Sequence, residues 1–128
     1  MMGLEAFIAR RCVQTAVYWT PDGEDGYGNT VFTSDSPREI ACRWEDSTRL
    51  MTDAQGDEIV VRAEVFVTED LEEKGVLYLG TLDDLDSAQE DDPKQVDGAY
   101  EIRRFDKMPE LGSATKFLRK AYLTIWQR

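Results

Sequence analysis

The sequence predicts an all-β protein, a small antiparallel β-barrel of about seven short strands with extended loops. Apolar and polar residues alternate with period two over most of the chain, as in strands that bury one face. Helical periodicity is scarce, and clusters of Gly, Pro, Asn and Asp separate the alternating runs. With 128 residues, 41% of them hydrophobic, the chain is long enough for a single core and too apolar for full disorder.

The first two strands are expected at residues 12–19 and 30–33, paired with each other as a hairpin. Odd-numbered and even-numbered side chains of the first run take opposite faces of the strand. The stretch between the runs, PDGEDGYGN at 21–29, is expected to be a loop because Gly and Asn tolerate positive φ.

The next two strands are expected at residues 38–45 and 58–68. In the first, Ile40, Cys42 and Trp44 share the inward face. The second is the clearest strand of the chain, because it is rich in β-branched residues and places Val61 on its apolar face. We therefore expect Trp44 and Val61 in the core. The polar segment between these strands, 46–57, is expected to be a mobile loop.

The last three strands are expected at residues 76–79, 99–105 and 117–126, with 107–113 joining the final two. Residues 81–98 hold seven acidic residues and one lysine, which predicts an acidic excursion from the barrel with one helical turn near 82–85. Residues 1–11 are expected to form an N-terminal arm or a short helix. The sequence thus predicts one barrel domain over 12–128.

The formal net charge of −11 is unevenly distributed. Residues 45–97 carry 17 acidic and four basic groups, whereas residues 98–128 carry seven basic and three acidic groups. This asymmetry predicts a contact between copies of the chain or with a partner of opposite charge. The alternative is a solvated acidic surface that confers solubility. The excess of acid argues against nucleic acid as the main partner, because such binding relies on Lys and Arg.

Several kinds of chemistry are excluded or disfavoured. The chain has no histidine, which excludes Ser-His-Asp triads, Cys-His pairs and His-ligated metals. Cys12 and Cys42 are too few for a zinc site and are expected as buried thiols rather than a disulfide. The acidic run 83–92 lacks the glycine and spacing of an EF-hand loop, and 23–28 lacks the lysine of a phosphate-binding loop. We expect no catalytic residue, metal or cofactor, and an enzyme that uses carboxylates alone is a minor alternative.

The order of parts along the chain carries a family resemblance. An alternating strand leads into Asp25-Gly-Tyr-Gly-Asn-Thr-Val31, and a strand containing Trp44 precedes the polar insertion. Three further segments follow in order, Ile59-Val-Val-Arg-Ala-Glu-Val-Phe-Val67, Gly75-Val-Leu-Tyr-Leu-Gly80 and Ala99-Tyr-Glu-Ile-Arg-Arg-Phe-Asp106, before a last strand near Tyr122. In this order, residues 10–125 resemble the small head–tail joining proteins of long-tailed bacteriophages, also called head-closure, head-completion or stopper proteins.

The resemblance implies a small β-barrel that serves as a virion protein of the phage neck after synthesis in the host cytoplasm. Copies would form a homo-oligomeric ring, expected to be a hexamer, below the portal and adaptor and above the tail tube or tail-terminator protein. The ring would close the channel on packaged DNA and dock the tail. No apolar run approaches the roughly 20 residues that span a bilayer, so no membrane partner is expected.

In related stoppers a loop between two strands projects into the channel. The matching insertion is 46–57, whose alternative is an ordinary hairpin end. The channel-loop candidates are Ser47, Thr48, Arg49, Leu50, Met51, Thr52, Asp53 and Gln55.

Charge supplies the candidates for subunit or partner interfaces. These are Asp83, Asp84, Asp86, Asp91, Asp92, Arg103, Arg104, Lys116, Arg119 and Lys120. An acidic lumen would repel phosphates and let DNA pass without specific binding. Two rival functions stay open, another neck ring (adaptor or tail terminator) and a small barrel binding module of the OB type.

Overall fold

A computed structural model describes residues 12–32, 37–53, 55–109 and 117–125 of the chain. Its strands are β1 (Gln14–Trp19), β2 (Pro21–Glu24), β3 (Thr30–Phe32), β4 (Arg38–Thr52), β5 (Glu58–Val67), β6 (Val76–Leu79), β7 (Ala99–Pro109) and β8 (Phe117–Ile125). Three short helical segments, η1 (Leu82–Asp84), α2 (Ser87–Asp91) and η2 (Pro93–Gln95), lie between β6 and β7. The helical turn predicted near 82–85 corresponds to η1, and two further helical segments follow it that the sequence did not predict.

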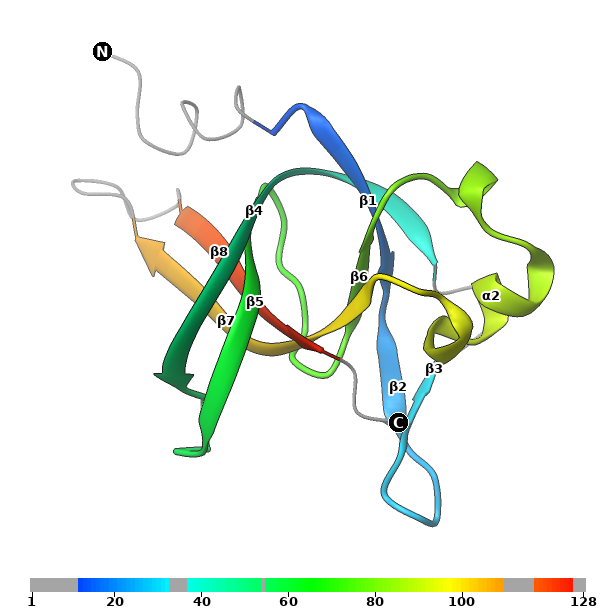
Figure 1. Cartoon of the computed structure of the whole chain (residues 1–128), viewed down its shortest axis with the longest axis horizontal. Helices are drawn as coiled ribbons and strands as arrows, with labels where there is room; N and C mark the ends of the chain where they lie inside the picture. Colours follow the sequence, from blue (N-terminus) through cyan, green and yellow to red (C-terminus); the bar gives the residue numbers. More distant parts are fainter. Residues whose placement is uncertain (1–11, 33–36, 54, 110–116, 126–128) are drawn as a thin grey trace.

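Six strands form a closed barrel in the order β1-β4-β5-β8-β7-β6 (Figure 1). All of its neighbouring strands are antiparallel, and β1 closes the barrel by pairing with both β4 and β6. The strands β2 and β3 form a separate two-stranded sheet. The predicted small antiparallel β-barrel is confirmed.

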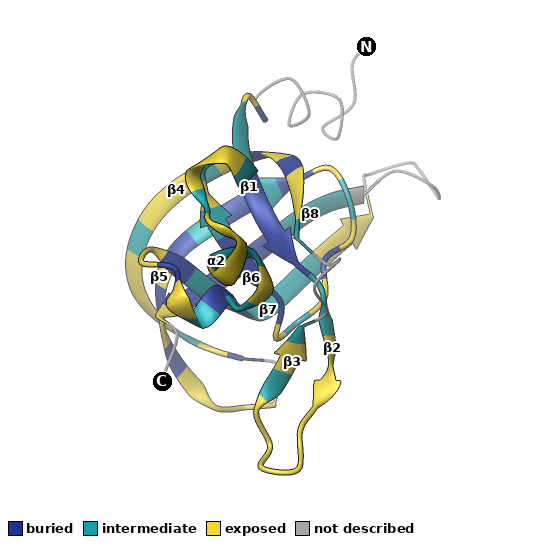
Figure 2. Ribbon diagram, turned by 90° about the vertical axis from the view of Figure 1, so that its right-hand side faces the viewer, coloured by how far each residue is buried: buried dark blue, intermediate teal, exposed yellow. Residues whose placement is uncertain are grey.

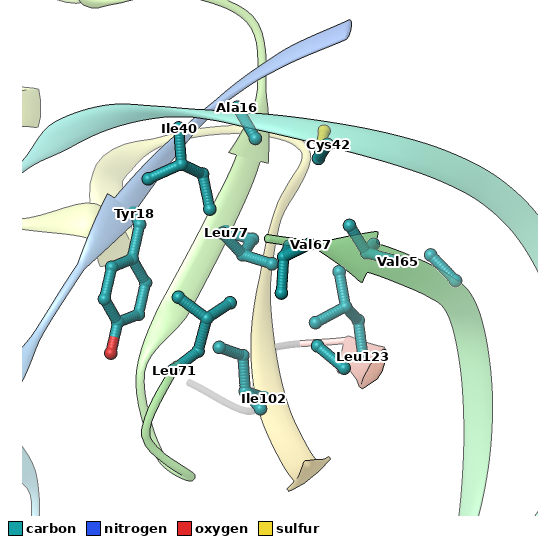
Figure 3. Close-up of a cluster of buried hydrophobic side chains, with 12 residues drawn as sticks. Ala16, Tyr18, Ile40, Cys42, Val65, Val67, Leu71, Leu77, Ile102 and Leu123 are labelled. Atoms are coloured by element: carbon teal, nitrogen blue, oxygen red, sulfur yellow. The ribbon is translucent and has the colours of Figure 1, made fainter. Parts of the chain in front are cut away.

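Inward side chains from all six barrel strands form the main core (Figure 3). Val65, Leu77, Ile102 and Leu123 have no exposed surface. The ring of Tyr18 is also buried, and its hydroxyl oxygen accepts a hydrogen bond from the backbone N–H of Glu72 at 2.9 Å. This bond satisfies the one polar group that the tyrosine brings into the core.

The other face of β1 is buried as well, because the excursion covers it. Val17 and Trp19 pack with Val76 and Val96 in a second core cluster. The indole N–H of Trp19 donates to the backbone carbonyl of Glu90 at 2.9 Å. The excursion is therefore fastened to the outside of β1 and β6 instead of hanging free.

Three sequence predictions about these strands need correction. The first strand does not pair with residues 30–33, since β1 pairs with β4 and β6 while β2 pairs with β3. The predicted loop at 21–29 contains β2. The connector predicted from residue 107 begins later, because β7 continues to Pro109 along β8.

The two residues predicted to lie in the core differ in burial. Val61 is fully buried, whereas Trp44 is half-buried and packs against the main core from its edge. The indole N–H of Trp44 donates to Asp46 Oδ1 at 3.2 Å, so its polar end faces outward. The predicted arm at 1–11 lies outside the described residues.

Candidate functional site

The predicted channel loop, 46–57, is mostly strand. β4 continues to Thr52 and β5 begins at Glu58, so only 53–57 form the turn of a long β4–β5 hairpin. Arg49 lies opposite Val61, and Thr52 lies opposite Glu58. The prediction of a loop over 46–52 is wrong, and its alternative, the end of a β-hairpin, matches the structure. The register shifts between Asp46 and Arg49, which marks a bulge where the hairpin extends past the barrel.

Asp53 builds the turn at the tip of this hairpin. Its Oδ1 accepts hydrogen bonds from the backbone N–H groups of Gln55 at 3.0 Å and Asp57 at 2.9 Å. Gly56 adopts a φ of 89°, a left-handed conformation that favours glycine, and its N–H donates to the Asp53 carbonyl at 3.1 Å. The local sequence Asp-x-x-Gly thus closes the turn without outside help.

Two arginines of β7 tether this tip to the barrel. Arg103 Nη2 donates to Asp53 Oδ2 at 2.8 Å, and Arg104 Nη1 donates to the Thr52 carbonyl at 2.9 Å. Burial alone would raise the pKa of Asp53, but hydrogen bonds from Asp57, Arg103 and Gln55 outweigh it and lower the pKa. Charged groups therefore bond the tip to the barrel, and the predicted mobility of this segment stays a prediction.

A second charged cluster lies at the base of the hairpin around Glu64. Its carboxylate accepts from Ser47 Oγ at 2.9 Å and from Arg49 Nη2 at 3.0 Å, and it forms an ion pair with Lys120 at 2.5 Å. Burial opposes ionisation of Glu64, but the bonds from Lys120 and Ser47 and the charges of Lys120 and Arg49 lower its pKa. The cations of Arg49 and Lys120 also lie within 6 Å of the Tyr122 ring centroid.

The remaining basic candidates are also engaged within the chain. Arg119 Nε contacts Asp70 Oδ1 at 2.7 Å, and Lys107 Nζ contacts Asp70 Oδ2 at 3.0 Å, which together lower the pKa of Asp70. Arg104 Nε contacts Asp106 at 2.9 Å. Arg103, Arg104, Arg119 and Lys120 therefore each have an acidic partner in their own chain. Lys116 lies outside the described residues.

The acidic candidates lie on the other side of the barrel. In the strand order, the β1–β6 pair that carries the excursion is opposite the β5–β8 pair (Figure 1). Asp84, Asp86 and Asp92 each accept a backbone N–H bond and so shape the short helical segments. Asp83 and Asp91 are exposed. The structure thus places the acidic candidates opposite Arg119 and Lys120 of β8, whereas Arg103 and Arg104 lie on β7, the neighbour of β6.

The β2–β3 hairpin projects from the barrel, and the sequence prediction treated its first strand and its tip, 21–29, as a loop. It extends away from the barrel in both views, with its tip exposed (Figures 1 and 2). Tyr27 at the tip has 92% of its surface exposed. Asp25 closes this turn by accepting from the N–H groups of Tyr27 at 2.8 Å and Asn29 at 3.0 Å. The spacing Asp-x-x-Gly, shared with the tip at 53–57, is the sequence signal that identifies both turns.

A cleft opens where β5 separates from β8. The β5–β8 pairing stops at Ala63 opposite Leu123, although β5 begins five residues earlier at Glu58. The opening has a volume of about 310 Å³ and a lining that is more polar than apolar, in which Val60 is 41% and Ile125 54% exposed. Its lining is Glu58, Ile59, Val60, Arg62, Arg103, Thr124 and Ile125. No sequence signal marks this cleft, because it depends on where two strand pairings diverge.

The described residues hold little that is typical of a reactive centre. No group of three or more Cys, Asp or Glu side chains in 12–32, 37–53, 55–109 and 117–125 is arranged to hold a metal ion. Cys12 and Cys42 are free, buried thiols, and burial raises the pKa of Cys42 to about 12. Within the described part of the chain, no helix combines the length and the apolar character needed to cross a membrane.

Comparison with known proteins finds no similar protein. No protein-family model matches the chain, and no curated protein or solved structure shows significant similarity to it.

Proposed function

We propose that this chain is a non-enzymatic structural protein of the neck of a long-tailed bacteriophage. Copies form a ring, six being the expected number, between the portal or adaptor and the tail tube or tail-terminator protein. The ring retains packaged DNA and docks the tail. The observation that carries the proposal is the order of strands and turns over residues 10–125, which resembles the head-closure proteins.

The fold supplies parts that suit this role. The six-stranded barrel is closed, and the β2–β3 and β4–β5 hairpins extend from it (Figure 1). Because Arg103 and Arg104 hydrogen-bond to the β4–β5 tip, this hairpin has a defined conformation before it contacts its partner, and we call it a shaped arm. A shaped arm loses less conformational entropy on assembly than a flexible loop.

The charges of the described residues support passage of DNA without specific binding. Arg103, Arg104, Arg119 and Lys120 are paired with carboxylates of the same chain. The whole chain carries a net charge of −11. A surface of this kind repels a polyanion, so DNA slides past it.

Removing the gene from a phage that encodes this chain tests the proposal. We expect heads that lose DNA and tails that stay unjoined, and a cryo-EM map of the complete particle should place the barrel in a neck ring. Normal particles formed without the protein would overturn the proposal. Tight binding of the isolated chain to DNA at low salt would favour the OB-type binding module instead.

Ring assembly should also depend on salt. An interface with charged groups weakens as added salt screens them. We expect sedimentation velocity of the concentrated chain to show a smaller species at high salt than at low salt. An oligomer that does not respond to salt would count against a charged interface.

A further inference from the structure

We propose that the β2–β3 hairpin of one copy docks into the cleft between β5 and β8 of a second copy. This inference rests on the proposed ring, and it names the two surfaces that meet. The hairpin surface is defined as residues 21–32, and the seam cleft as the lining of the opening between β5 and β8 described above.

The hairpin surface has the features of an inserting element. Residues 22–29 are all exposed, and the Asp25 turn fixes the shape of the tip. Tyr27, 92% exposed, places an aromatic ring at its end. A rigid tip with an exposed tyrosine gains much buried area on contact at little entropic cost, which is why tyrosine is enriched at interfaces.

The seam cleft has the complementary features. Within its mainly polar lining, Val60 and Ile125 are exposed apolar side chains against which an aromatic ring can pack. Arg62 in its lining has no ion pair or hydrogen bond among the described residues. The lining also holds Arg103 and one carboxylate, Glu58, so the net charge of the cleft is positive. The hairpin surface carries Asp22, Glu24 and Asp25 and no Lys or Arg, with Glu24 paired to Lys74 of its own chain, so the net charges of the two surfaces are opposite.

Backbone pairing adds a second point of fit. Among the described residues, β5 over 58–62 has β4 as its only strand neighbour, and β2 and β3 pair only with each other. Each surface therefore presents a strand edge with unpaired N–H and C=O groups, which is suited to strand addition. Because the two surfaces differ, each copy uses its hairpin on one neighbour and its cleft on the other. Such head-to-tail contacts close into a ring when the rotation from one copy to the next divides a full turn, and they give an open filament otherwise.

Site-specific photo-crosslinking tests the contact in the full chain. Tyr27 is replaced by p-benzoylphenylalanine, and this chain is irradiated at low salt with a heavy-isotope-labelled copy. We expect adducts between position 27 and residues 58–62 or 124–125 of the labelled copy. The matched control carries the same group at Val13, which is 83% exposed and lies outside both surfaces. Adducts from position 27 only to other segments, or no adducts, would overturn the proposal.

Two variants test the direction of the contact. Tyr27→Ala and Arg62→Glu change exposed side chains, and each should weaken self-association by about tenfold or more. Each keeps one intact surface, so a mixture of both should form dimers and nothing larger. A ring that survives Tyr27→Ala overturns this contact and leaves the neck proposal standing. Particles that assemble normally without the protein overturn the neck proposal and leave the contact standing.

Discussion

The two hairpin tips of this protein use the same turn and have different surroundings. In the tip at 25–29 and in the tip at 53–57, an Asp accepts N–H bonds from residues two and four positions later. In each, the glycine at the fourth position adopts a positive φ. Yet the first tip is exposed over its whole length, while Arg103 and Arg104 hydrogen-bond to Asp53 and Thr52 of the second. Local sequence thus fixes the shape of a turn, and tertiary partners decide whether it is available to another molecule.

The largest expected difference between the hairpins is in how much a strand valine of each contributes to the free energy of unfolding. Val61→Ala removes a fully buried side chain beneath the β4–β5 hairpin and should lower the free energy of unfolding by about 2–3 kcal/mol. Val31→Ala makes the same change in the β2–β3 hairpin, where the side chain is 38% exposed. That variant should stay within about 0.5 kcal/mol of the parent. Urea denaturation of both measures the contrast, and equal losses would refute it.

The two turn aspartates should differ in the same direction. Asp53→Ala removes the oxygen that accepts two N–H bonds and leaves Arg103 without this partner, whereas Asp25→Ala removes the corresponding acceptor in an exposed turn. The urea midpoint should therefore fall clearly for Asp53→Ala and only slightly for Asp25→Ala. An equal fall in both midpoints would show that the arginine tether contributes little.

The same aspartates predict a dependence on pH. The pKa of Asp53 is lowered in the folded chain, with burial opposing the shift and hydrogen bonds causing it, and the pKa of Asp70 is lowered by Arg119 and Lys107. A lowered folded pKa gives stability that is present above the unfolded value, near 4, and is lost as the pH falls through the folded value. Urea midpoints should drop below about pH 4, and less steeply in Asp53→Ala. An unchanged slope in that variant would contradict the assignment.

Limited proteolysis should rank the tips by accessibility. A protease of broad specificity should cut the free chain at 25–29 before 53–57, because exposed residues occur at both tips but arginine side chains bond only the second to the barrel. Arg104→Ala should speed cleavage at 53–57 and leave the rate at 25–29 unchanged. Mass spectrometry of early fragments gives both rates. First cleavage at 53–57 in the parent would reverse the comparison.

The smallest change in stability is expected for a substitution of Glu101, which lies in the space between the two hairpins. This residue lines a groove of about 340 Å³ together with Gly28 and Gln55, and burial raises its pKa although Arg103, Lys74 and Lys94 oppose the shift. A raised folded pKa destabilises the ionised form, so Glu101→Gln should gain less than about 1 kcal/mol at pH 7. The gain should vanish at acidic pH, where the parent carboxyl is protonated. A loss of stability at pH 7 would indicate that the ion pair with Arg103 outweighs burial.

Period-two alternation predicted the barrel strands well where one face is buried. The run at 58–67 shows this clearly, since Ala63, Val65 and Val67 belong to the main core. The same signal failed at 46–52, because this part of β4 extends past the barrel and no apolar face is needed there. A strand that is exposed to solvent on both faces is as polar as a loop, so alternation of apolar and polar residues cannot reveal it.

Pairing and site geometry were harder to predict than strands. The run at 12–19 gave no indication that β1 joins β4 and β6 instead of the nearest run, because that choice depends on distant residues. The charged candidates were named without their partners. Only the fold brings Asp53 to Arg103 and Glu64 to Lys120. Sequence therefore predicted which groups are charged and left open which of them neutralise each other.

The pairing of β1 with β6 has a consequence for how the chain folds. Trp19 lies opposite Val76, and four strands separate these residues along the sequence. Closing the barrel therefore costs the conformational entropy of a long loop before the β1–β6 hydrogen bonds and side-chain contacts form. Domains dominated by such distant pairings fold in about milliseconds to seconds. During that interval the edges of β1 and β6 stay open, so a newly made chain is most exposed to wrong pairing before closure.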